Sequence, residues 1–295
     1  MICNICKKPQ DKIIYNGKIR ISSKSNSRKK YILVRCSDCE LISFKSFLEN
    51  ENFFISGEYR KIFDKGLSIS NFIKNHKKRE FDKLNFYNLK KKNIHKKTIA
   101  ELGCGAGILL DYFKNNGASN TIAVERAKFW KKHLEEKHLY YESVESLYNS
   151  GLKVDLVTSF AEVEHMQDPL KYCTFIYKTL NKNGKLLIRS PNYNNIYRYL
   201  LKNYYDLYDI RSSHYHYFNE ISLKKLLMKS GFSSKNIKVD FFNEYNFDNL
   251  IKWLIHKKIN KDNLPINFDK NFNESYLNFL RKNKLSNCLA FVATK

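Results

Sequence analysis

The feature that most constrains this chain is a regular alternation of short apolar runs with amphipathic segments, which begins at Thr98. Apolar runs of strand length that alternate with helical segments are typical of a doubly wound parallel sheet. We expect strands at 98–102, 121–125, 139–141, 154–160, 184–190, 237–242 and 288–294. Helices are expected at 107–116, 127–137, 169–181 and 220–230. The sequence therefore predicts an α/β fold with a seven-stranded, mostly parallel sheet.

A glycine-rich turn directly follows the first expected strand, and it reads Glu101-Leu102-Gly103-Cys104-Gly105-Ala106-Gly107. Glycine lets the backbone turn sharply and approach a ligand closely. The E-x-G-x-G-x-G spacing differs from the dinucleotide fingerprint G-x-G-x-x-G, and no G-K-[ST] of a P-loop is present. Glu125 ends the second strand, where a carboxylate can accept both hydroxyls of a ribose. Together the two features indicate a nucleoside cofactor.

Four of the seven cysteines form two pairs near the N-terminus, Cys3-x-x-Cys6 and Cys36-x-x-Cys39. Two such pairs can place four thiolates around one tetrahedral zinc ion, which closes a module too small to have its own core. Four free thiols or a redox pair are the alternatives. We expect a zinc-ribbon-like module with structural Zn²⁺ over residues 1–48, containing strands at 13–15, 19–21 and 31–34 and a polar turn at 22–30. A helical linker or cap at 49–97 and the α/β domain at 98–295, with an insertion at 244–286, complete the expected organisation.

The chain of 295 residues carries a formal charge of +24, and residues 1–97 hold 24 basic against 9 acidic residues. An abundance of Lys, Asn, Ile, Phe and Tyr is what an AT-rich genome produces, so part of this excess is compositional. The functional interpretation is an anionic partner such as RNA, a membrane surface or a phosphorylated substrate. No apolar run approaches the roughly 18 residues of a membrane span, and no secretory signal is present. We therefore expect a cytoplasmic protein without a membrane span.

With the glycine turn and Glu125 in these places, residues 98–295 resemble the class I S-adenosylmethionine-dependent methyltransferases, whose sheet is Rossmann-like. The resemblance implies S-adenosyl-L-methionine as the cofactor. In that family the glycine turn lies under the methionine part, the acid after the second strand holds the ribose, and a pair after the third strand lies near the adenine. The cofactor-binding residues that the resemblance implies are Glu101, Gly103, Cys104, Gly105, Gly107, Glu125, Arg126, Ser143, Val144 and Phe160.

Three further motifs are similar to those of a subgroup that acts on sugars, nucleotide-linked sugars and other small metabolites. Residues 164–169 match an E-H-x-x-D-P run, and residues 214–218 match an H-x-x-x-F segment. Residues 184–192 resemble the G-G-x-L-h-I-x-x-P-N stretch, with Asn183 in place of the first glycine. Many relatives also carry an N-terminal four-cysteine zinc module followed by an E-Y-Y-like segment, which here reads Glu58-Tyr59-Arg60.

Methyl transfer from a sulfonium is an in-line displacement at carbon, so the enzyme mainly aligns the acceptor with the methyl group. A hydroxyl acceptor also requires a general base. Histidine titrates near neutrality, so we expect His165 to be the base, with Glu164 orienting it. His214 and His216 are alternative bases or substrate contacts. Two other roles for Glu164 and His165 stay open, namely ordering the loop and holding a divalent ion that activates the acceptor oxygen.

The sequence thus predicts an O-methyltransferase acting on a sugar, a nucleotide-sugar or a surface-glycan precursor. Its partner would be a small-molecule or glycan acceptor, including phosphate-bearing ones. The alternative is an RNA or nucleotide-base methyltransferase that holds phosphates with its basic zinc module. Against that alternative, no N-P-P-Y-like tetrapeptide follows the fourth strand and no cysteine stands in a Pro-Cys setting. A scaffold without enzymatic activity is the third hypothesis, and it predicts no binding of S-adenosylmethionine.

Overall fold

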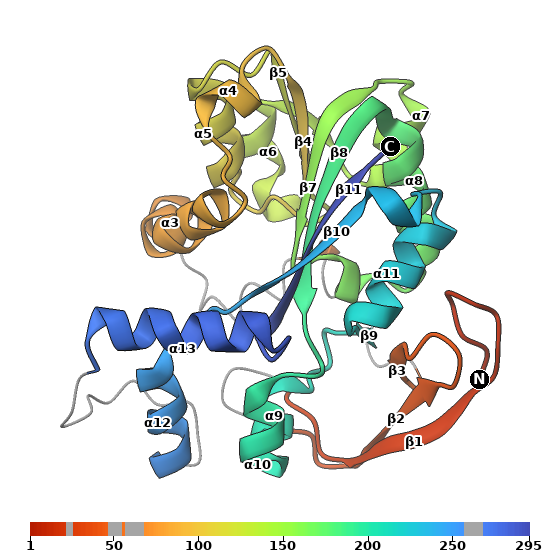
Figure 1. Ribbon diagram of the computed structural model, residues 1–295. Helices are drawn as coiled ribbons and strands as arrows, with labels where there is room; N and C mark the ends of the chain where they lie inside the picture. The colour runs from red at the N-terminus through yellow and green to blue at the C-terminus, as the bar shows by residue number, and fades with distance from the viewer. Residues whose placement is uncertain (22–25, 47–54, 57–67, 257–267) are drawn as a thin grey trace.

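A seven-stranded sheet forms the centre of the computed structural model, which describes residues 1–21, 26–46, 55–56, 68–256 and 268–295 (Figure 1). Its strands are β4 (Thr98–Leu102), β5 (Asn120–Val124), β6 (Leu139–Tyr141), β7 (Val154–Phe160), β8 (Leu180–Pro191), β10 (Ile237–Phe242) and β11 (Cys288–Thr294). They lie side by side in the order β10-β11-β8-β7-β4-β5-β6. The strands from β8 to β6 are parallel to their neighbours, while β11 is antiparallel to both β8 and β10. The predicted Rossmann-like, mostly parallel sheet is confirmed.

Helices cover both faces of this sheet (Figure 1). One face carries α3 (Ile69–Phe86), α4 (Lys91–Ile94), α5 (Ile108–Asn115) and α6 (Lys131–Glu135), and the other carries α7 (Val144–Asn149), α8 (Pro169–Thr179) and α11 (Glu220–Lys229). Successive residues of a strand point to opposite faces. Ile99 therefore packs in the cluster beneath α3 and α5, whereas Ala100 packs in the cluster beneath α8 and α11. These two apolar cores hold the strand ends in fixed positions.

Two expected element boundaries are wrong. The helix expected at 127–137 is split, because residues Lys128–Trp130 form a short 3₁₀ helix (η1) and the α-helix α6 follows it. The helix expected at 169–181 ends at Thr179, and the next strand begins at Leu180 instead of residue 184. Leu180 already pairs with Val154 across the sheet, and an irregularity in register separates this pair from the pairing of Leu156 with Lys185.

The N-terminal residues form a second, antiparallel sheet from β1 (Gln10–Gly17), β2 (Tyr31–Cys36) and β3 (Ile42–Phe44). A fourth strand, β9 (His216–Tyr217), reaches this sheet from the C-terminal half and pairs with β3. The strand expected at 19–21 is wrong, since Arg20 makes only isolated bridges there. Residues 22–25, 49–54 and 57–67, which include part of the expected turn and linker and all of Glu58-Tyr59-Arg60, lie outside the described residues.

The described part of the expected insertion at 244–286, which leaves out residues 257–267, forms α12 (Phe247–His256) and α13 (Lys270–Lys282). Trp253 of α12 is buried against Tyr197 and Tyr205, which belong to α9 (Ile196–Leu201) and α10 (Asn203–Asp209). This aromatic cluster fixes the chain that follows β10. A short 3₁₀ helix, η3 (Ser234–Asn236), precedes β10.

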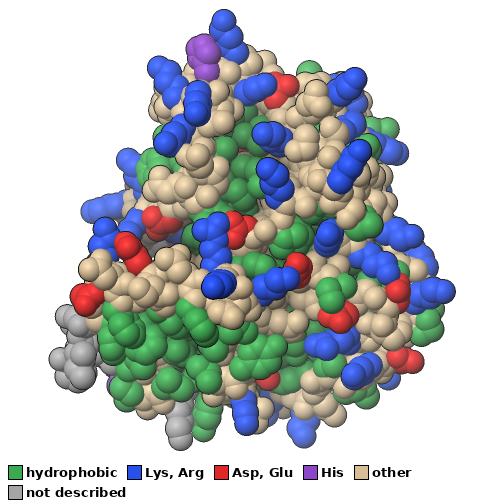
Figure 2. All heavy atoms as spheres, in the orientation of Figure 1, with side chains coloured by type: hydrophobic (Ala, Val, Ile, Leu, Met, Phe, Trp, Pro, Cys, Tyr) green, Lys and Arg blue, Asp and Glu red, His purple; other side chains and the backbone are tan. Residues whose placement is uncertain are grey.

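On the face shown in Figure 2, Lys and Arg side chains are scattered over the upper and lower parts alike. Among the helices that the structure describes, none has the length and apolar character needed to cross a membrane.

Candidate functional site

A cavity of about 380 Å³ opens at the carboxyl ends of β4, β5, β7 and β8. The strand order reverses between β4 and β7, and ligands of doubly wound sheets bind at such a switch point. Ten of the residues singled out in the sequence line this cavity, namely Glu101, Gly103, Cys104, Gly105, Glu125, Arg126, Phe160, Glu164, His165 and His214. Gly107, Ser143 and Val144 do not line it, and Ser143 instead caps the start of α7. The cofactor role of those three residues stays a prediction.

The glycine turn closes one side of the cavity with its backbone. Gly103 and Gly107 both adopt left-handed conformations, with φ of +68° and +71°. A Cβ at Gly103 would lie 2.5 Å from Oε2 of Glu162, and one at Gly107 would lie 3.0 Å from a methyl group of Leu134. The left-handed conformation therefore favours glycine at both positions, and any other residue would also displace the Glu162 carboxylate or the Leu134 methyl group.

Two carboxyl groups flank this turn. Glu125 accepts hydrogen bonds from the backbone N–H of Gly105 (2.8 Å) and of Ala127 (2.9 Å), one on each oxygen. A carboxylate has about four lone-pair sites, so Glu125 keeps capacity for a ligand's hydroxyl groups. Glu101 is buried, and its Oε2 has no hydrogen-bond partner among the described residues. Burial, and then the charge of Glu80, raise the pKa of Glu101 well above its ordinary value.

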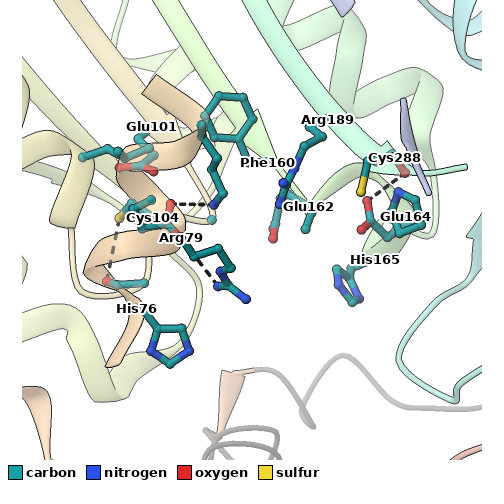
Figure 3. A pocket seen from close by; sticks show the side chains of 18 of the residues that line it. His76, Arg79, Glu101, Cys104, Phe160, Glu162, Glu164, His165, Arg189 and Cys288 are labelled. Carbon is teal, nitrogen blue, oxygen red and sulfur yellow. Dashed lines mark hydrogen bonds and ion pairs between the residues drawn. The ribbon is translucent and has the colours of Figure 1, made fainter. Parts of the chain in front are cut away.

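Glu164, His165 and His214 form a buried cluster across the cavity from the glycine turn, with one ligand-type atom from each within 4.8 Å of the others. Figure 3 shows Glu164 and His165 on one side of the cavity and Glu101 and Cys104 on the opposite side. Nδ1 of His165 donates to the carbonyl of Ser213 at 2.6 Å, so the neutral ring carries no proton on Nε2. Oε2 of Glu164 accepts from Ser190 Oγ at 3.1 Å. Oε1 of Glu164 and Nδ1 of His214 have no hydrogen-bond partner within the described part of the chain.

The acid–base properties of this cluster differ from the sequence-based expectation. Burial, followed by the charge of Arg126, lowers the pKa of His165 to about 3, so the expectation that it titrates near neutrality is wrong. Burial also lowers the pKa of His214 well below its usual range. The carboxyl group of Glu164 responds oppositely, because burial raises its pKa to about 7. A general base works best with a pKa near the operating pH, so Glu164 is better matched to that role than either histidine.

The carbonyl of Ser213 orients the His165 ring, a role that we had expected Glu164 to fill. His216 lies outside the cavity lining. Its Nδ1 accepts from Ser43 Oγ at 2.7 Å and its Nε2 donates to the carbonyl of Gln167 at 3.2 Å. Both ring nitrogens therefore serve to attach the N-terminal sheet, which argues against His216 as a base.

Sequence reasoning missed several charged residues of the cavity. Ala161, with φ of +58°, turns the chain directly after β7, and the next residue, Glu162, lines the cavity. Burial raises the pKa of Glu162 to about 7, although Arg126 lies 3.8 Å away. Arg189 of β8 and Lys83 of α3 also line the cavity. A charge inside the apolar run Leu186-Leu187-Ile188-Arg189 was a usable signal, because charged residues are seldom buried without a partner.

The four N-terminal cysteines come together as their spacing indicated. The Sγ atoms of Cys3 and Cys39 are 3.3 Å apart, as are those of Cys6 and Cys36, and the four sulfur atoms lie within 4.8 Å of one another. All four are free thiols. Four thiolates at about 2.3 Å from a tetrahedral zinc ion would be about 3.8 Å apart, so the arrangement fits such an ion after a small expansion.

Fold and cavity together define an α/β protein with a ligand cavity at the switch point of its parallel sheet. A family described as a methyltransferase domain matches residues 73–235, which is more than half of the chain, so the protein belongs to that family. The chain therefore carries a methyltransferase domain.

Individual relatives are distant. The chain is similar to the mitochondrial ubiquinone biosynthesis O-methyltransferase of Dictyostelium discoideum, with 27% identity over 135 residues. That alignment covers 38% of this chain and only 42% of the relative. Among solved structures, a SAM-dependent methyltransferase from Archaeoglobus fulgidus superposes with a TM-score of 0.51 and 21% identity, covering 76% of this chain and 99% of that one. The latter similarity supports the fold.

The residues of the cavity fit the adenosyl cofactor of this class. The left-handed glycine turn offers bare backbone, and Glu125 keeps acceptor capacity for ribose hydroxyl groups. Beneath the turn, the buried Glu101 has an oxygen without a partner among the described residues. Predicted cofactor residues therefore gather at one end of the cavity, and the Glu164 cluster lies at the other.

Proposed function

We propose that this protein O-methylates a sugar, a nucleotide-sugar or a surface-glycan precursor. The observation that carries the proposal is the arrangement of residues around the cavity. The glycine turn and Glu125 face Glu164, a buried carboxyl group whose pKa burial raises to about 7. The resemblance to sugar-directed methyltransferases supports the acceptor class. The similarity to a protein named as an O-methyltransferase supports oxygen as the methylated atom, although that protein aligns over only part of its length.

Each residue set has a distinct role in this proposal. Bound S-adenosylmethionine supplies an electrophilic methyl group. Glu125 and the glycine turn hold the adenosyl portion and fix its position relative to the sheet. Ionised Glu164 removes the proton of the acceptor hydroxyl through its unpartnered Oε1, while Ser190 holds the other oxygen. His165, neutral because its pKa is low, accepts a hydrogen bond from the acceptor at Nε2.

The same cluster also supports a second candidate mechanism. Glu164, His165 and His214 offer one carboxylate and two imidazoles within ligand distance of one another, a donor set that suits a divalent transition metal. In that case the three residues would hold the ion, which would polarise the acceptor oxygen. Preincubation with EDTA decides between the two, because the base mechanism retains activity after chelation and the metal mechanism loses it.

We further propose that Cys3, Cys6, Cys36 and Cys39 bind one structural zinc ion. The close approach of the four sulfur atoms supports this assignment. Plasma mass spectrometry of the purified protein should find one zinc per chain, and Cys36→Ser should lower that value. Cys173→Ala, which changes a buried cysteine outside the cluster, should leave it unchanged. A zinc content near zero in the wild-type protein would refute the assignment.

Methyl transfer is tested with S-adenosylmethionine carrying a labelled methyl group and a panel of sugars, nucleotide-sugars and glycans. The label should enter an acceptor hydroxyl, and Glu164→Gln should reduce its incorporation by two to four orders of magnitude, as expected for loss of a general base. Glu145→Gln, on the exposed surface of α7, is the matched control. Labelling confined to RNA would refute the sugar proposal and support the alternative acceptor.

A further inference from the structure

A group of five charged side chains lies at one end of the cavity, where α3 meets the ends of β8 and β10. Three are cations and two are carboxylates, and they are Arg79, Lys83, Arg189, Glu80 and Glu244. The pairs Lys83–Glu80, Arg79–Glu80 (3.4 Å) and Arg189–Glu244 (2.9 Å) connect them. Both carboxylates are ionised. Burial alone would raise the pKa of each, and the neighbouring cations, Lys83 for Glu80 and Arg189 for Glu244, more than offset that effect. The group therefore has one more cation than it has anions.

Arg189 stands out within this group. Its side chain is 5% exposed, and Nη2 contacts Glu244. Nη1 is buried and has no hydrogen-bond partner among the described residues, yet the residue lines the cavity. Figure 3 places its side chain between Phe160 and the Glu164–Cys288 side of the cavity. More than nine in ten buried polar groups in native proteins find a partner, so an unpartnered guanidinium nitrogen facing a cavity indicates a ligand atom.

The chemistry of the site indicates what that ligand is. A guanidinium group presents parallel N–H donors that match the oxygen atoms of phosphate and carboxylate. The excess positive charge of the group favours an anion at the same place. Glu101 lies beside Glu80 and Lys83 of this group, and burial raises the pKa of Glu101 well above its ordinary value, which disfavours a further negative charge there. A neutral sugar hydroxyl could accept one N–H of Nη1, whereas an oxyanion would accept it through a charge-assisted hydrogen bond, which is roughly twice as strong.

We propose that Arg189 anchors an oxyanion subsite that binds a phosphate or carboxylate group of the methyl acceptor. The inference rests on the proposed function, which it deepens by assigning an anionic group to the acceptor. Lys83 and Arg79 lie on the same side and supply the surrounding positive charge. The subsite would hold the acceptor by its anion while the hydroxyl group to be methylated lies toward Glu164.

Calorimetry tests the subsite directly. The protein is first saturated with S-adenosylhomocysteine, so that the amino-acid carboxylate of the cofactor product is already in place. Inorganic phosphate and benzoate are then titrated in separate experiments, which distinguish a phosphate from a carboxylate. We expect one of the two anions to bind. If neither binds while S-adenosylhomocysteine does, the subsite is refuted and the methyltransferase function stands. If S-adenosylhomocysteine itself does not bind, the proposed function is refuted.

Two variants separate this role from a purely structural one. The double change Arg189→Met with Glu244→Gln removes both charges together, so that neither is left buried alone. It should weaken binding of the anion about ten- to a hundredfold, the range expected for a charge-assisted hydrogen bond, with the affinity for S-adenosylhomocysteine unchanged. Glu244→Gln alone should strengthen anion binding, because it releases Arg189 from its carboxylate. Unchanged anion affinity in the double variant, or a loss of cofactor-product affinity instead, would overturn the assignment.

Discussion

Replacing Glu164 with Gln should make the protein more stable and less active, because the same burial that tunes this carboxyl group also costs folding free energy. Burial raises its pKa from the ordinary value of 4.5 to about 7 in the folded state. The folded protein therefore holds the proton more tightly than the unfolded chain does. Stability from this group is complete below pH 4.5 and falls as the pH rises toward 7. Each pKa unit corresponds to about 1.4 kcal/mol, so the cost is about 1 kcal/mol at pH 5 and about 3 kcal/mol at pH 8.

Glutamine cannot ionise, so Glu164→Gln removes this cost while it also removes the base. Urea denaturation at pH 5 and pH 8 measures the free energy of unfolding of both proteins. The stability advantage of the variant should grow by about 2 kcal/mol between the two pH values. Glu145→Gln, at a side chain that is half exposed, should stay within about 0.5 kcal/mol of the wild type at both pH values. If the difference in unfolding free energy between the variant and the wild type were the same at pH 5 and pH 8, ionisation of Glu164 would not destabilise the fold and the reasoning would be refuted.

Three further changes test other parts of the molecule. Glu125→Ala removes the acceptor of two backbone N–H groups and of the ribose, and calorimetry should show S-adenosylmethionine binding weakened at least tenfold. Gly103→Ala adds a Cβ 2.5 Å from the Glu162 carboxylate at a left-handed φ, so it should lower the free energy of unfolding by more than Gly151→Ala, where φ is also positive but the space is open. The control alone should cost about 1–2 kcal/mol. His216→Ala removes two hydrogen bonds, from Ser43 Oγ and to the carbonyl of Gln167, and should cost about 1–3 kcal/mol in urea denaturation.

The central sheet was predictable because its pattern is local. Five of its seven strands, at 98–102, 139–141, 154–160, 237–242 and 288–294, have the expected bounds, as each is a short apolar run bounded by polar residues. The strand β3 was missed, because its three residues lie outside the strand–helix alternation that located the equally short β6. Likewise, β9 has only two residues, and its pairing with β3 is a long-range contact that no local pattern encodes.

The sequence predicted the residues of the cavity that belong to a motif, and it did not predict the others or their acid–base behaviour. The glycine turn and Glu164-His165 follow strands directly, so their place at the strand ends follows from the fold. The acid–base behaviour of His165 could not be read from its position, because it depends on burial by segments distant in sequence. Arg189 and Glu244 meet across 55 positions, and only the folded chain brings them together.

The pairing of β3 with β9 joins the N-terminal sheet to the segment next to the cavity. His214 precedes β9 by two residues, and the backbone N–H of Tyr215 between them donates to the carbonyl of Glu164 at 2.9 Å. Hydrogen bonds therefore connect the N-terminal four-stranded sheet, through β9, to the segment that carries Glu164. Removing residues 1–48 would remove β3, the strand that pairs with β9, and would make the segment that carries His214 more mobile. An N-terminal truncation is thus expected to lower methyl transfer. Oxidation of the N-terminal thiols, far from the cavity, is expected to lower it through the same contacts.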